Sequence, residues 1–425
     1  MTSDTRPPPP PPSLDRLFLG RQPILDANDG LIGYELLFRD SADNRAATVD
    51  PGMATADVVC KAFTDLGLSG SLEGYKAFII ADGEFLAHDA IEALPPDGVV
   101  LQIDGALAAR PEVNARCLEL EERKYAFCLL NPAGCGGALA ELLRRAAFVK
   151  LNVQDADTTV LDAITSLPIG ERPILIASHV ETKADREQAA ALGFQFFQGY
   201  FFAEPTLVEG KKLDPVAHGL IRIINLINQD AELPALEQAF KAEAALTVKL
   251  LRLTNSVGVG LRARIGSVRQ AITIIGRRPL MRWLQLLLYS RRGDDDFERN
   301  PLMQLAALKG GFMERLARHC YPRQVAVSDQ SFLAGLMSLM PAALGMPMQE
   351  ILDQIPVAPA LRQALLERGG EIGRLLELTD CYDNDDWAGT DRMLVELGHG
   401  IGREVLNQCL VEAIAWVQSL SVEAE

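Results

Sequence analysis

The sequence predicts an α/β part followed by an all-α part, and three observations support this. The chain has 425 residues, which is more than one ordinary hydrophobic core uses. Up to about Pro205, short apolar runs alternate with helical stretches. From about Val208, amphipathic helices follow one another to the end. We therefore expect a Pro-rich tail over 1–14, an α/β domain over 15–207 and a helical domain over 208–425.

In the first part, apolar runs have the length of strands. They lie at Leu17–Leu19, Ala77–Ile80, Val99–Ile103, Ala126–Leu130, Phe148–Val153 and Ile174–Ala177. Helical segments such as Ala54–Asp65, Arg110–Lys124 and Thr182–Leu192 separate several of them. This alternation indicates βα units around a parallel sheet, either a compact barrel or a doubly wound sheet. Because an eight-stranded barrel normally takes about 250 residues, a barrel here would be trimmed.

In the second part, apolar residues recur at helical spacing. They share faces at Leu246, Leu250 and Leu253, and at Val268, Ile272 and Ile275. Ser267 is placed to cap the second of these helices, and Gly276, with Pro279 after it, to close it. The segment Leu280–Tyr289 is apolar on nearly all sides and predicts a buried helix.

Composition limits the class of protein. The net charge of −16 argues against non-specific binding of nucleic acid. The seven cysteines are scattered, which is typical of buried thiols in a reducing cytoplasm. We expect no signal peptide, because prolines follow the first residues, and no membrane span, because apolar stretches such as Trp283–Tyr289 fall short of about 20 residues. A cytoplasmic protein is predicted.

Four short motifs follow one another through the first part. They are Arg21-Gln22-Pro23-Ile24, Tyr34-Glu35-Leu36-Leu37-Phe38-Arg39, Val180-Glu181-Thr182 and Gln198-Gly199-Tyr200-x-Phe202-x-x-Pro205. In order and spacing they resemble EAL domains, the metal-dependent phosphodiesterases of cyclic di-GMP. The resemblance implies a trimmed (β/α)8 TIM-like barrel. It implies a vestigial site at Glu35, Leu37, Arg39, Lys150, Glu181 and Gln198.

Compared with that family, this chain lacks most of the metal ligands. The family's ligand positions are occupied by Ile80, Gln102, Leu130, Asn131, Asn152 and Ser178. Glu35, the family's catalytic lysine at Lys150, and Glu181 are retained. Neutral amides do not supply the charge that two divalent cations demand, and Ile80 and Leu130 offer no oxygen. We therefore expect no metal, no cofactor and no phosphodiesterase activity.

Binding of cyclic di-GMP without metal is an alternative. Arg39 and Lys150 could pair with its phosphates. Against this, Glu35 and Arg39 could form an ordinary ion pair at the end of a strand. We favour the absence of nucleotide binding, keeping a metal-independent sensor as the alternative and a residual phosphodiesterase as a third possibility.

The second part resembles a different family. The segments Ala242–Ser256, Ile265–Gly276 and Ser331–Met340 resemble helices of HDOD domains, which are regarded as non-catalytic interaction modules. Ser338 and Leu339 stand where HD phosphohydrolases carry their metal-binding His-Asp pair, so these ligands are also missing. The only His-Asp dipeptide, His88-Asp89, lies in the barrel half.

An EAL-like barrel followed by HDOD resembles a class of bacterial signalling proteins, and the resemblance extends from about Leu17 to about Leu420. It implies an inactive adaptor or regulator of motility, biofilm or virulence that acts through contacts with other signalling proteins, with a homodimer possible. We expect the old active-site face of the barrel and grooves of the helical domain to be the contact surfaces.

Two charged segments are interpreted as structural features and not as binding sites. The arginines of the second part, Arg262, Arg264, Arg269, Arg277, Arg278, Arg282, Arg291 and Arg292, are expected to form a solvated face paired with the acidic loop around Asp294–Asp296. The run from Asp380 to Asp386 lacks the glycine and glutamate of a calcium loop, so we predict an exposed acidic turn.

Overall fold

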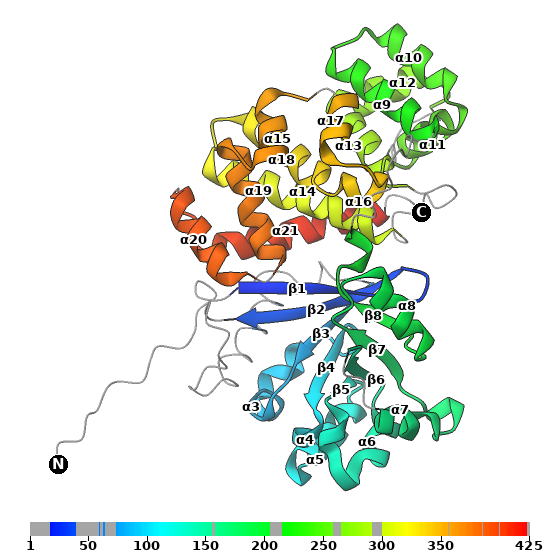
Figure 1. Ribbon diagram of the computed structural model, residues 1–425, viewed down its shortest axis with the longest axis vertical. Helices are drawn as coiled ribbons and strands as arrows, with labels where there is room; N and C mark the ends of the chain where they lie inside the picture. Colours follow the sequence, from blue (N-terminus) through cyan, green and yellow to red (C-terminus); the bar gives the residue numbers. More distant parts are fainter. Residues whose placement is uncertain are drawn as a thin grey trace, which may run out of the picture.

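The computed structural model describes residues 18–39, 59, 63, 74–154, 158–204, 215–257, 265–290, 300–355, 357–384, 386–398 and 400–422. Figure 1 shows a barrel below a layer of helices, with the first two strands between them. The predicted Pro-rich tail, the junction between the two parts and the acidic loop lie outside the described residues, as does the helix predicted over Ala54–Asp65 apart from Val59 and Phe63.

The first part is a closed barrel whose strands pair in sequence order. They are β1 Phe18–Leu25, β2 Leu31–Arg39, β3 Lys76–Ile80, β4 Val99–Asp104, β5 Ala126–Leu130, β6 Phe148–Asn152, β7 Ile174–Ser178 and β8 Phe196–Gln198. The barrel prediction is confirmed, and the doubly wound alternative is wrong.

One strand departs from the predicted parallel arrangement. Strands β2 to β8 pair in parallel, whereas β1 is antiparallel to both β2 and β8. A tight turn joins β1 to β2, in which the Asp26 carboxylate accepts hydrogen bonds from the backbone N–H groups of Asn28 and Gly30, both at 2.8 Å. So short a connection can join only antiparallel strands, because a parallel pair needs a crossover of a dozen or more residues.

Helices and 3₁₀ turns connect the later strands. The α-helices are α3 Gly83–Ala87, α4 Gly105–Ala108, α5 Pro111–Glu122, α6 Leu139–Arg145, α7 Thr158–Thr165 and α8 Lys183–Ala191, and the 3₁₀ turns are η2 Asp89–Ala93, η3 Pro132–Ala138, η4 Ile169–Glu171 and η5 Phe201–Ala203. Inside the barrel, Ile24, Phe78, Val100, Cys128, Phe148 and Ile176 form a separate apolar cluster. This layer is the floor under the polar residues described below.

The second part is helical throughout its described residues. Its helices are α9 Pro215–Asn228, α10 Leu233–Ala242, α11 Ala244–Val257, α12 Val268–Ile275, α13 Arg277–Leu287, α14 Pro301–Cys320, α15 Val325–Met337, α16 Met340–Leu344, α17 Met348–Gln354, α18 Pro359–Glu367, α19 Gly370–Asp383, α20 Trp387–Leu397 and α21 Arg403–Val422. Helix α14 is buried along nearly its whole length and contacts α15, α19 and α21.

Local signals in this part were largely correct. The Ser267 side chain caps α12 by accepting from the N–H of Gln270, and Gly276 ends that helix at a φ of 82°. Pro279, however, lies inside the first turn of α13, where proline is tolerated. The predicted buried helix Leu280–Tyr289 corresponds mostly to α13, although Met281, Arg282 and Trp283 are only half-buried.

The two parts share one hydrophobic core. A single cluster of buried side chains extends from Leu19 of β1 to Val417 of α21. Helices α19 and α21 contact β1, and α14 and α16 contact η5. Of the helices that the structure describes, none is by itself long and apolar enough to cross a membrane; one pair bent by 108°, Val325–Leu344 with Met348–Gln354, meets the length and composition requirement jointly.

Candidate functional site

Glu35 is the centre of a polar cluster inside the barrel. Its Oε1 accepts hydrogen bonds from Lys150 Nζ at 2.6 Å and from Gln102 Nε2 at 2.7 Å, and its Oε2 accepts one from Gln198 Nε2. The Gln198 amide also donates to Gln22 Oε1 at 2.7 Å. Five residues from β1, β2, β4, β6 and β8 therefore meet above the apolar floor, and Glu35 is only 5% exposed.

A lysine from another strand is the described cation beside Glu35. Glu35 lies in the middle of β2, not at a strand end, and the structure pairs it with Lys150. Arg39 is the last residue of β2, and its side chain lies outside the described residues. Closure of the barrel brings Lys150, which is 115 positions away in the chain, to the same carboxylate.

The ionisation of Glu35 follows from these neighbours. Burial raises the pKa of its carboxyl group, but the Lys150 ammonium and the amide donors outweigh burial and hold the pKa below its ordinary value of 4.5. The ammonium and the carboxylate together carry no net charge.

Two divalent cations do not fit this cluster. The Oε1 atoms of Gln102 and Gln198 are buried and have no hydrogen-bond donor among the described residues, but both are neutral. Glu35 already shares its oxygens among an ammonium and two amides. Within the described part of the chain, no group of three or more His, Cys, Asp or Glu side chains is arranged to hold a metal ion. A two-metal site needs several free carboxylates.

The other predicted site residues lie around the mouth of the barrel, and those whose side chains the structure describes make no hydrogen bond to Glu35. At the strand ends Ile80 is 48% exposed, and Leu37, Leu130 and Asn152 are half-buried. Ser178 is buried beside His179, with 3.3 Å between its Oγ and the histidine Nδ1. Glu181 is exposed.

Asp104 at the end of β4 is a residue that sequence reasoning missed. One of its carboxylate oxygens accepts from Asn131 Nδ2 at 2.9 Å, and the other caps the backbone N–H of Ala106 at 2.9 Å. An acidic residue directly after a buried strand was the available signal. Asp104 therefore caps the amino end of α4, and its bond with Asn131 holds the loop after β5.

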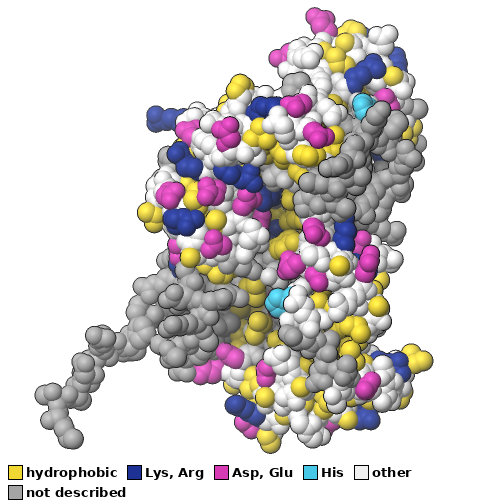
Figure 2. All heavy atoms as spheres, in the orientation of Figure 1, with side chains coloured by type: hydrophobic (Ala, Val, Ile, Leu, Met, Phe, Trp, Pro, Cys, Tyr) yellow, Lys and Arg dark blue, Asp and Glu magenta, His cyan; other side chains and the backbone are white. Residues whose placement is uncertain are grey.

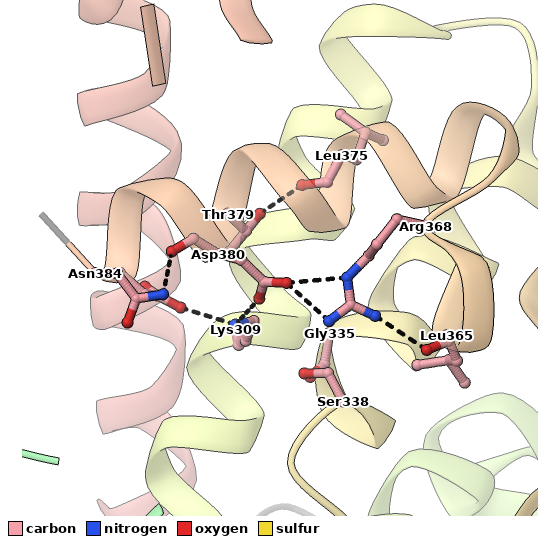
Figure 3. Close-up of polar contacts among 10 residues, drawn as sticks. Lys309, Gly335, Ser338, Leu365, Arg368, Leu375, Thr379, Asp380 and Asn384 are labelled. Atoms are coloured by element: carbon pink, nitrogen blue, oxygen red, sulfur yellow. Dashed lines mark hydrogen bonds and ion pairs between the residues drawn. The ribbon is translucent and has the colours of Figure 1, made fainter. Parts of the chain in front are cut away.

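In the helical part, Ser338 and Leu339 stand between α15 and α16, and the Ser338 hydroxyl donates to the Gly335 carbonyl at 2.7 Å. Near Ser338, Lys309 of α14 reaches the end of α19 (Figure 3). Its Nζ lies 2.6 Å from Asp380 Oδ1 and 3.1 Å from Asp383 Oδ2, and Arg368 Nη2 lies 2.9 Å from Asp380 Oδ2.

The prediction of an exposed acidic turn over Asp380–Asp386 is therefore wrong for its first aspartates. Asp380 and Asp383 belong to the last turn of α19 and face a lysine that is only 8% exposed. Burial lowers the pKa of Lys309, but Asp383 and Asp380 outweigh it and leave the pKa above its ordinary value of 10.5.

The predicted arginine face consists of ion pairs where it is described. Arg269 pairs with Glu237, Arg277 with Asp230, Arg278 with Asp329 and Arg282 with Glu314. Basic and acidic side chains are interspersed over the helical layer in Figure 2. Glu237, Asp329 and Glu314 lie on other helices, and Asp230 lies in the turn after α9. Arg262, Arg264, Arg291, Arg292 and the acidic loop lie outside the described residues.

Comparison with known proteins supports both resemblances. The sequence model of the HDOD domain family matches residues 213–348. The chain is 27% identical over 416 residues to YuxH of Bacillus subtilis, covering 95% of this chain and 99% of that protein. It is 28% identical over 410 residues to the cyclic di-GMP phosphodiesterase CdgJ of Vibrio cholerae, covering 95% of this chain and 93% of that protein.

Solved structures also resemble the barrel part. The EAL domain of Mycobacterium smegmatis DcpA overlays with a TM-score of 0.35 and 17% identity, covering 43% of this chain and 90% of that domain.

Proposed function

Since the chain is a tandem of an EAL-type barrel and an HDOD domain, we propose that it acts in cyclic di-GMP signalling as a catalytically inactive adaptor. The observation that carries the proposal is the cluster around Glu35. The one family metal ligand retained inside the barrel is neutralised by Lys150 and hydrogen-bonded by two glutamine amides.

The chemistry of phosphodiester hydrolysis explains why this cluster matters. Metal ions neutralise the phosphate and lower the pKa of the attacking water, and they need several carboxylates to hold them. In this chain the Lys150 ammonium is paired with the Glu35 carboxylate. Ile80 and Leu130, which correspond to ligand positions of the EAL family, have hydrocarbon side chains that cannot bind a metal ion. CdgJ is named as a phosphodiesterase, whereas the bonds that Glu35 makes in this chain favour an inactive protein.

The output of an adaptor is contact with another protein. Ile80 is 48% exposed at the barrel mouth, beside half-buried Leu130 and Leu37. Exposed apolar groups among polar side chains such as Asp104 and Asn131 suit a protein surface better than they suit a dinucleotide carrying two phosphates. We propose that signalling proteins bind at this mouth and at the HDOD domain.

The first test is titration of the purified protein with cyclic di-GMP, with and without Mn²⁺, followed by product analysis of the same samples. We expect neither product nor stabilisation by Mn²⁺, since a cation that binds the folded state would raise the unfolding midpoint. Glu35→Gln is the matched control. Mn²⁺-dependent product from the wild type that is lost in Glu35→Gln would refute inactivity. Binding without metal and without product would instead make the protein a nucleotide sensor.

The second test addresses partner capture. Ile80→Asp places a charge in the apolar mouth and should reduce cross-linking of partners from a cell lysate at least severalfold. Ile169→Asp in η4 is the control, because Ile169 is also an exposed hydrophobic residue, at 84%, but it precedes β7 and so lies at the end of the barrel opposite the mouth. Equal capture by both variants would contradict a binding role for the mouth.

A further inference from the structure

Strand β1 has an edge that the barrel itself does not cover. Its pairing with β8 extends only over Ile24 with Gln198 and Leu25 with Phe197. The segment from Phe18 to Pro23 runs beyond these pairs, although it stays paired with β2 on its other side. Unpaired strand edges leave backbone N–H and C=O groups in need of partners.

Side chains of the helical domain satisfy this edge. The backbone N–H of Leu19 donates to Asn407 Oδ1 of α21 at 3.1 Å, and the Leu19 carbonyl accepts from the Tyr382 hydroxyl of α19 at 2.5 Å. The Tyr382 hydroxyl also lies 3.3 Å from Asn407 Oδ1. Each of these three residues is at least 97% buried. The helical domain thus bonds both polar groups of one barrel residue.

Further along this edge, the barrel itself supplies one partner. The carbonyl of Arg21 accepts from the Tyr200 hydroxyl at 3.0 Å, and Pro23 has no N–H to satisfy. Next to this edge, the Arg21 guanidinium lies over the Tyr34 ring, 5.0 Å from its centroid. A small cavity at this place is lined from both domains, by Arg21 and Tyr34 and by Pro301 and Leu305 of α14.

The same strand also reaches the polar cluster in the barrel. Gln22 follows Leu19 by three positions, and its Oε1 accepts from Gln198, which donates to Glu35. Strand β1 is therefore bonded at one residue to the helical domain and at another to the interior of the barrel.

We propose that the helical domain completes the barrel, with Tyr382 and Asn407 taking the place of a neighbouring strand along β1. A partner that moves α19 or α21 then opens the seam between β1 and β8 and disturbs the Gln22–Gln198–Glu35 chain. This coupling between the helical domain and the seam of the barrel goes beyond the adaptor function. It does not depend on that function, because it would operate in the same way in an active enzyme.

Hydrogen exchange of the full chain tests the proposal. Tyr382→Phe removes only the hydroxyl and keeps the aromatic ring. The centroid of this ring lies 5.6 Å from that of Phe312 and 5.5 Å from that of Trp387. The buried Leu19 carbonyl then loses its donor. We expect amide exchange in β1 and β8 to become about tenfold faster, since local opening of this seam is favoured.

Tyr289→Phe is the matched control. Tyr289 is equally buried, and its hydroxyl donates to the Leu336 carbonyl within the helical domain. It should leave exchange in β1 unchanged. Asn407→Leu, which removes the acceptor of the Leu19 N–H, is a second variant that should also loosen β1. Unchanged exchange in β1 for both Tyr382→Phe and Asn407→Leu, or an equal increase for Tyr289→Phe, would overturn the proposal. Turnover of cyclic di-GMP by the wild type would not affect it.

Discussion

Each domain pairs a largely buried lysine with one or two carboxylates, but the two clusters are built differently. In the barrel, Lys150 meets one carboxylate, and glutamine amides make the remaining bonds to Glu35. In the helical domain, Lys309 meets two aspartates, and Arg368 binds one of them from outside. In the barrel cluster the side chains of Lys150 and Glu35 are only 10% and 6% exposed. In the helical domain the side chains of Arg368 and Asp380 are 40% and 28% exposed.

This difference shows where each cluster is vulnerable. Removal of a lysine leaves one carboxylate with amide donors in the barrel, but two carboxylates with one arginine in the helical domain. A buried carboxylate without its cation is costly, because the charge has lost both water and its partner. The comparison therefore predicts a larger loss in the helical domain, reduced in part by solvent at Asp380.

The largest effect is expected for Lys309→Met. Asp380 and Asp383 would face one another without the ammonium between them, and we expect the free energy of unfolding to fall by about 3 kcal/mol. Urea unfolding at pH 7 measures it. Lys241→Met is the control, because the Lys241 side chain is 63% exposed and Glu237 keeps its pair with Arg269, so the midpoint should stay unchanged. A Lys309→Met variant as stable as the control would contradict a structural role for the cluster.

A smaller loss, about 2 kcal/mol at pH 7, is expected for Lys150→Met, since the amides of Gln102 and Gln198 still donate to Glu35. Without Lys150, only the two amide donors oppose the effect of burial, so the pKa of the Glu35 carboxyl group rises relative to the wild type. The variant therefore recovers stability relative to the wild type as the pH falls. Urea unfolding at pH 7 and pH 5 tests this, and a gap that widens in acid would refute it.

The double variant Glu35→Gln with Lys150→Met sharpens this prediction. It removes both charges at once and should be more stable at pH 7 than Lys150→Met alone. If the double variant is less stable, Glu35 contributes through contacts other than its pairing with Lys150.

The smallest effect concerns the wild type at extreme pH. The lowered pKa of Glu35 gives stability that is present above its ordinary value of 4.5 and is lost as the pH falls through the lowered value. The raised pKa of Lys309 gives stability that is present below 10.5 and is lost as the pH rises through the raised value. Acid should loosen the barrel first, and alkali the helical domain. Limited proteolysis at both extremes measures the order, and the reverse order would break the comparison.

Sequence reasoning was reliable where the signal is local. The strands β3 to β7 lie within a residue or two of the predicted apolar runs, because a buried parallel strand is apolar along its length. Ser267 was recognised as a cap for the same kind of reason, since a cap acts on residues only a few positions away. The resemblance to EAL and HDOD families rested on such short motifs.

Sequence reasoning did not predict contacts between residues that are far apart in the chain. No local pattern connects Glu35 with Lys150, because only closure of the barrel brings these two residues together. Asp380 and Asp383 were predicted to lie in an exposed turn because the run lacks the glycine and the glutamate of a calcium loop. A cluster of acidic residues does not by itself distinguish a loop from the last turn of a helix. Their partner, Lys309, is 71 positions from Asp380 in the chain.

The sequence by itself determined the order of elements, the division into a barrel part and a helical part, the Ser267 cap and the absence of a carboxylate at Ile80, Gln102 and Leu130. Only the tertiary structure decided the direction of β1, the helical side chains that cover its edge and the lysine that neutralises each carboxylate. The physical reason is range: propensities and caps act over a few residues, whereas closure of a barrel and docking of helices join groups that the chain keeps far apart.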